Sequence, residues 1–115
     1  SGQLPLVSGS LPMTGLVGDQ ISQEDAAGQA RVAALNALAA AADVAGGVNN
    51  IRRVVRVVVY VASTADFTAQ PAVANGASEL FGEIFGDAGR HIRSAIGVAS
   101  LPLGAPVKVE LTVQV

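Results

Sequence analysis

Arg93 and Glu110 are the two residues whose side chains could together handle a small carboxylic acid. A guanidinium holds a planar carboxylate through two parallel hydrogen bonds, and a carboxylate beside a water molecule can move protons. A turn rich in Pro and Gly separates the two residues, and if it centres near Leu103 and Gly104, residue 97 lies opposite Glu110. Gly97 would then leave open space beside the carboxylate. The spacing also fits a structural cross-strand ion pair, so both interpretations stay open.

His91 and Ser94 are a second pair of residues that could suggest chemistry, as a base and its nucleophile. Three residues apart on an extended segment, their side chains face opposite sides, so no direct hydrogen bond is expected. His91 is better explained as a rim or interface residue. The basic group at positions 52, 53 and 56 is typical of a solvated strand end or of ion pairs between subunits.

Composition excludes several classes of function. The chain has 115 residues, enough for one small domain, and a net charge of −2 argues against a protein that must neutralise many phosphates. It has no Cys and one His, which excludes disulfides, thiolate nucleophiles and a multi-histidine metal site within one chain. Its only Lys is Lys108, and no phosphate-binding loop is present. We therefore expect no cofactor, no metal and no nucleic acid partner.

Two helices are predicted. Ser22 with Asp25 has the form of a capping box, and the following Ala-rich stretch predicts a helix to about residue 45, ended by Gly46 and Gly47. Pro71 predicts the start of a second helix that runs to Gly86. The expected buried stripes are, in the first helix, Val32, Leu35, Leu38 and Ala42, and in the second, Val73, Ala77, Leu80, Phe81, Ile84 and Phe85.

Residues 4–7 are expected to finish a strand, and further strands are expected at 51–63, 92–99 and 107–115, the last with strict alternation of apolar and polar residues. The order strand–helix–strand–helix–strand–strand predicts an α+β domain with two helices on one face of a mixed sheet.

The other face of the sheet is expected to lack cover within the chain. It should include Val54, Val58 and Tyr60, and the mean hydropathy of +0.48 is high for so small a protein. Exposed apolar area of this kind usually marks an interface, so we expect an oligomer. The longest apolar run, 57–62, is far short of the ~20 residues that a spanning helix needs, and we expect no membrane partner.

Three stretches carry a resemblance to a known family: SGQLP at 1–5, NGASELFGEIFG at 75–86 and, most specifically, GRHIRSAIGVASLPLGAPVKVE at 89–110. They resemble the reactive intermediate deaminase family (Rid or YjgF, also labelled endoribonuclease L-PSP), with GRHIRSA and NGASELF closest to a bacterial subgroup. The resemblance covers nearly the whole chain. It implies one domain at 1–115 with a chorismate-mutase-like fold, in a cytoplasmic homotrimer with clefts between subunits.

The resemblance also implies an activity, the hydrolysis of enamine or imine intermediates such as 2-aminoacrylate and 2-iminopropanoate to a 2-keto acid and ammonia. It assigns the substrate carboxylate to Arg93 and the positioning or activation of water to Glu110. Substrate binding would extend to the segment with Ser94, Ala95 and Gly97. A trimeric carboxylate-binding or regulatory protein without turnover is the alternative, and a small carboxylic acid is the expected ligand of both.

Two features depart from the family pattern. Many members have Cys where Ala95 stands. Members also have two further strands and a loop ahead of the position of Ser1, and that loop supplies a Tyr and often a Ser to the cleft. The contribution of both features to a site in this chain is therefore in question.

Overall fold

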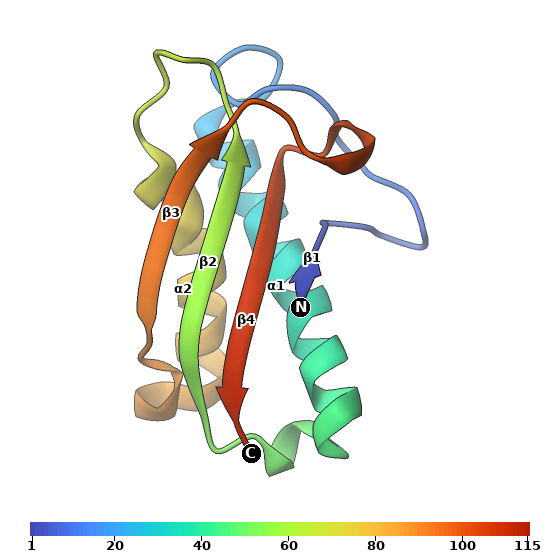
Figure 1. Cartoon of the computed structure of the whole chain (residues 1–115), viewed down its shortest axis with the longest axis vertical. Coiled ribbons are helices and arrows are strands. Elements are labelled where there is room, and N and C mark those ends of the chain that lie inside the picture. Colours follow the sequence, from blue (N-terminus) through green and yellow to red (C-terminus); the bar gives the residue numbers. More distant parts are fainter.

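The computed structural model describes residues 1–115 as a mixed four-stranded sheet with two α-helices packed on one face (Figure 1). The elements are β1 (Gly2–Gln3), α1 (Gln23–Ala45), β2 (Arg53–Ala62), α2 (Gln70–Phe85), β3 (Ile92–Val98) and β4 (Val107–Gln114). The predicted α+β class, the element order and the placement of both helices on one face are confirmed. The opposite face of the sheet carries no helix (Figure 1).

The sheet has the order β1-β4-β2-β3, so β3 and β4 are not neighbours. The predicted pairing of Gly97 with Glu110 is therefore wrong: Gly97 pairs with Val61, and Glu110 pairs with Val58. β2 lies between the two strands, parallel to β3 and antiparallel to β4. β2 is rich in valine, with buried Val57 on the helix-covered face and buried Val58 on the open face, so burial favours a position inside the sheet over one at its edge.

A bulge in β2 changes which side chains face the helices. The pairing with β4 shifts between Val54 and Arg56, and this shift brings Val54 into the helix-covered core. Its predicted place on the uncovered face is therefore wrong, because the extra residue breaks the simple alternation of sides. Beyond the bulge the alternation holds, with Val57 facing the helices and Val58 the open face.

Helix α1 begins and ends as predicted. The Ser22 hydroxyl accepts a hydrogen bond from the Asp25 amide at 3.1 Å, and Gly46 ends the helix with a φ of 84°. The predicted stripe is only partly correct, because Leu35 is 46% exposed. The buried side chains are mostly alanines: Ala26, Gln29, Ala30, Ala33, Ala34, Ala37 and Leu38.

Small residues let α1 and α2 approach closely. A Cβ atom at Gly76 of α2 would collide with the backbone carbonyl of Ala27 on α1. The buried stripe of α2 agrees with the prediction at Val73, Ala77, Leu80 and Phe81. Ile84, however, is 43% exposed. The close approach of the two helices places α2 above β2 and β3.

The first residues of the chain also differ from expectation. The first strand is Gly2–Gln3, paired with β4, and not the predicted 4–7. The Asn36 side-chain amide donates to the carbonyls of Leu4 and Leu6 at 2.9 and 3.0 Å, which ties this segment to α1 instead of to the sheet.

Neither long helix combines the length and the apolar character that crossing a membrane requires.

Candidate functional site

Arg93 lies on the helix-covered side of the edge strand β3. It pairs with Val57, whose side chain is buried under the helices, and its guanidinium reaches α2. One nitrogen, Nη1, donates to Asn75 Oδ1 at 2.8 Å and to Ser78 Oγ at 3.3 Å. The side chain is exposed and no carboxylate lies within ion-pair distance. Arg93 is thus oriented by two hydrogen bonds to α2 and has no internal counter-ion.

His91 is bound within the chain and does not pair with Ser94. Its Nε2 lies 2.9 Å from Ser78 Oγ, and its Nδ1 lies 2.6 Å from the carbonyl oxygen of Gly89. The ring packs edge-on against the buried Phe81, with centroids 6.0 Å apart. The predicted absence of a His91–Ser94 hydrogen bond is confirmed, and the structure assigns Ser78 as the partner of His91.

Glu110 lies on the opposite face of the sheet from Arg93. It pairs with Val58 and accepts a hydrogen bond from the Tyr60 hydroxyl at 3.1 Å. This hydrogen bond, together with desolvation and the negative charge of Glu110, raises the pKa of Tyr60. The Lys108 ammonium sits 5.8 Å from the centre of the Tyr60 ring. Tyr60, Lys108 and Glu110 therefore form a polar cluster on the open face.

The remaining predicted site residues divide between the two faces of β3. Ala95 pairs with Val59 and Gly97 with Val61, so both share the helix-covered side with Arg93. Ser94 pairs with Val58 and shares the open face with Glu110. Of the predicted set, the fold therefore brings together Arg93 with Ala95 and Gly97, and separately Ser94 with Glu110. The open space predicted beside Glu110 does not come from Gly97.

One hollow contains a predicted site residue. It measures about 660 Å³ and lies at the carboxyl ends of β2 and β3, and its lining includes Gly97, Ser63 and Gln70. A Cβ atom at Gly97 would approach Gln70 Nε2 to 2.9 Å and Ser63 Oγ to 3.0 Å. Gly97 thus keeps this hollow open, although it faces away from Glu110.

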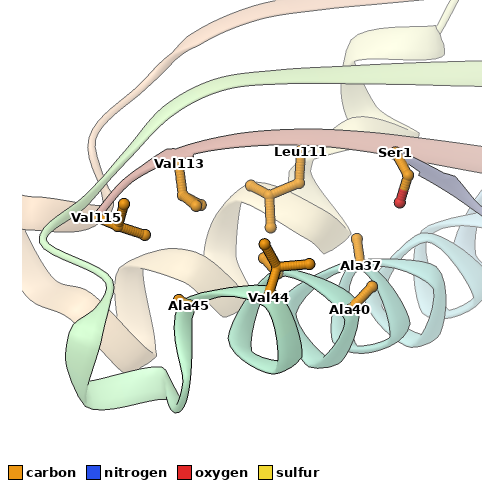
Figure 2. A pocket seen from close by; sticks show the side chains of 9 residues that line it. Ser1, Ala37, Ala40, Val44, Ala45, Leu111, Val113 and Val115 are labelled. Carbon is orange, nitrogen blue, oxygen red and sulfur yellow. The ribbon is translucent and has the colours of Figure 1, made fainter.

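A second hollow, between α1 and β4, has an almost wholly apolar lining. It measures about 510 Å³, and eight of its nine lining residues are hydrophobic. In Figure 2, Leu111 and Val113 of β4 point toward α1, and Val44 of α1 points toward Leu111. Only Ser1 carries a hydroxyl here, so we do not place a reaction in this hollow.

Comparison with known proteins decides the family. The family model described as "YjgF/chorismate_mutase-like, putative endoribonuclease" matches residues 1–115. The chain belongs to this family. The resemblance found in the sequence is thereby confirmed, as is the chorismate-mutase-like fold.

Individual relatives agree with this assignment. Protein TCP17 of Trypanosoma cruzi is 41% identical over 115 residues, which cover 99% of this chain and 72% of that protein. The structure of Atu1372 from Agrobacterium tumefaciens, described as of unknown function, has a TM-score of 0.96 at 41% identity and covers 100% of this chain and 73% of its own. A "putative endoribonuclease" from Shewanella oneidensis MR-1 also has a TM-score of 0.96, at 30% identity, with coverages of 100% and 76%.

Four residues make contacts in this candidate site that the sequence did not predict: Asn75, Ser78, Tyr60 and His91. Asn75 and Ser78 are three apart on α2, a spacing that places both on one helix face, so a polar pair there was a usable signal. The contact between Tyr60 and Glu110 could not be found, because it depends on β2 and β4 being neighbours. The role of His91 likewise depends on the position of α2.

Proposed function

We propose that this chain hydrolyses imines of small 2-keto acids to the keto acid and ammonia, in clefts between copies of the chain. The observation that carries the proposal is the state of Arg93, a cation oriented by α2 with no carboxylate partner of its own. A planar carboxylate is the ligand that best complements such a guanidinium.

The reaction needs few protein groups. Water adds to the electrophilic carbon of a C=N bond, the resulting carbinolamine loses ammonia, and a C=O bond remains. Both protons of the attacking water must leave its oxygen, one during the addition and one as the C=O bond forms, and two protons must reach the departing nitrogen. A carboxylate such as Glu110 can accept a proton from the oxygen in each step and pass it to the nitrogen, while Arg93 holds the substrate carboxylate and keeps the carbon in place.

The location of Glu110 favours a site shared by two copies. Arg93 and Glu110 leave opposite faces of one sheet, so a cleft that contains both is most simply built from Arg93 of one copy and Glu110 of another. The open face carries exposed Ile92 and Ile96, which suit an interface. A closed ring of copies, such as the homotrimer that the family resemblance implies, would contain one such cleft per neighbouring pair.

The experiment measures release of keto acid and ammonia from 2-iminopropanoate, made in situ by an amino-acid oxidase with a peroxide scavenger present. Wild type should accelerate release beyond the uncatalysed rate. Arg93→Ala should raise KM about tenfold or more, because it removes a charge-assisted pair of hydrogen bonds. Glu110→Gln should lower kcat by about 100-fold with a smaller change in KM.

The outcomes separate the two functions under consideration. Equal release with and without wild-type protein, together with binding of pyruvate that Arg93→Ala abolishes, would favour a carboxylate-binding protein without turnover. If the wild-type protein neither releases keto acid nor binds pyruvate, both functions are contradicted. We propose the cytoplasm as the compartment of this activity.

A further inference from the structure

Arg93 belongs to a chain of hydrogen bonds whose directions are fixed. The Gly89 carbonyl can only accept, so His91 carries its proton on Nδ1 and donates it there. In the neutral imidazole, His91 Nε2 is then an acceptor, and the Ser78 hydroxyl donates to it. The single hydrogen of Ser78 is therefore used, and its Oγ presents lone pairs to Arg93.

The His91 end of this hydrogen-bond chain is held by the core. The His91 ring meets the buried Phe81 at an interplanar angle of 89°. Gly89 is itself buried, and a Cβ atom there would collide with the Phe81 carbonyl. Neither ring nitrogen of His91 is free to turn to another partner without losing a short hydrogen bond. Ser78 thus receives its direction from the rigid part of the domain.

At the Arg93 end of this hydrogen-bond chain, the contacts of Nη1 determine which part of the guanidinium stays available to a ligand. Nη1 has two hydrogens, and Asn75 and Ser78 accept one each. Nη2 and Nε make no hydrogen bond within the chain, and their two parallel N–H groups form one edge of the planar group. That edge has the geometry to bind a carboxylate in two-point fashion.

We propose that Ser78 and His91 are positioning residues, which hold Arg93 so that its Nε–Nη2 edge faces the carboxylate of the ligand. The inference rests on the proposed function, since it assigns a task to the same guanidinium. Its physical basis is preorganisation: an exposed arginine has many rotamers, and a ligand that must select one binds less tightly.

The test compares four single variants in the imine assay and in equilibrium binding of pyruvate. Ser78→Ala should raise KM and the Kd of pyruvate roughly three- to tenfold, the size expected for one lost hydrogen bond, with kcat changed less than twofold. Ser78→Thr keeps the hydroxyl and should restore both constants. His91→Phe keeps the ring against Phe81 but should reproduce Ser78→Ala, whereas His91→Gln retains an acceptor and should behave closer to wild type.

A double variant separates positioning from an independent role. In an Arg93→Ala background, Ser78→Ala should change KM and Kd no further, because it acts only through the missing guanidinium. Additive losses would overturn the proposal. So would covalent labelling of Ser78 by a fluorophosphonate, which would show that the Ser78–His91 pair is a nucleophile and its base.

A measurement without ligand keeps this inference distinct from the proposed function. Nitrogen-15 NMR of the guanidinium groups should show slow rotation for Arg93 in wild type and Ser78→Thr, and faster rotation in Ser78→Ala and His91→Phe. The Arg93 signal is identified by its loss in Arg93→Lys. If wild type neither binds pyruvate nor releases keto acid while the rotation changes as stated, the proposed function fails and the positioning role stands. Unchanged rotation in Ser78→Ala overturns the positioning role whatever the activity.

Discussion

Arg93 and Glu110 lie on strands that flank β2 on either side, and their side chains leave the sheet from opposite faces. Arg93 reaches Asn75 and Ser78 on α2, whereas Glu110 accepts from Tyr60 on the face without helices. One copy of the chain thus presents the guanidinium proposed to bind a carboxylate on one side and the carboxylate proposed to transfer protons on the other. Assembly of copies would bring the two groups together.

The Tyr60–Glu110 hydrogen bond predicts the titration of a single chromophore. Tyr60 is the only tyrosine and the chain has no tryptophan, so absorbance at 295 nm reports Tyr60 alone. The hydrogen bond and charge of Glu110 favour the neutral phenol and raise its pKa. Glu110→Gln removes the charge and should lower the pKa toward the ordinary value of about 10.

Glu79→Gln is the matched control for this titration, because Glu79 is exposed on α2, on the other side of the sheet. It should leave the titration curve of Tyr60 unchanged. Identical curves for wild type and Glu110→Gln would show that the hydrogen bond is not formed in solution.

The open face of the sheet predicts an interface between copies. Ile96 lies on this face and is 46% exposed. Ile96→Asp places a charge where apolar contact between copies is expected, so it should shift the protein to smaller species in analytical ultracentrifugation. Ala39→Asp, on the exposed side of α1, should not. An Ile96→Asp protein that sediments like wild type would refute this assignment of the face.

Packing of the two helices predicts opposite effects for two glycines of α2. Gly76→Ala pushes a methyl group into the Ala27 carbonyl and should lower the free energy of unfolding by about 1–3 kcal/mol. Gly82→Ala meets no atom within 4 Å and should raise it by about 0.5–1 kcal/mol, because alanine is the better helix former. Urea denaturation measures both changes. Stabilisation by Gly76→Ala would mean that the helices lie further apart than described.

Much of the fold could be predicted because it depends on local signals. The Ser22 cap, the Gly46 stop and the alternation along β4 are set by neighbouring residues, and each was found at or within one residue of its predicted place. Leu35 was placed in the core by its spacing, yet alanines pack there instead, because the short distance between α1 and α2 favours small side chains.

The pairing of strands could not be predicted from the turn that separates them. β3 and β4 are adjacent in the sequence, and a hairpin was the simplest expectation, but the valine-rich β2, with buried side chains on both faces, lies between them. The predicted arrangement of Arg93 and Glu110 within one copy depended on this hairpin, so it was wrong as well. The types of the site residues were therefore a useful prediction, and their arrangement was not.

Mixing two impaired variants, with substrate well below the KM of wild type, tests the central claim, that Arg93 of one copy and Glu110 of another form one site. Arg93→Ala and Glu110→Gln are unfolded together in equal amounts, refolded, and assayed for keto acid release. A mixture of wild type with the double variant serves as the refolding control. Random assembly of a closed ring should make about one site in four complete, and about a quarter of wild-type activity should return. No recovery above either variant alone, with mixed oligomers demonstrated by native mass spectrometry, would contradict a site shared between copies.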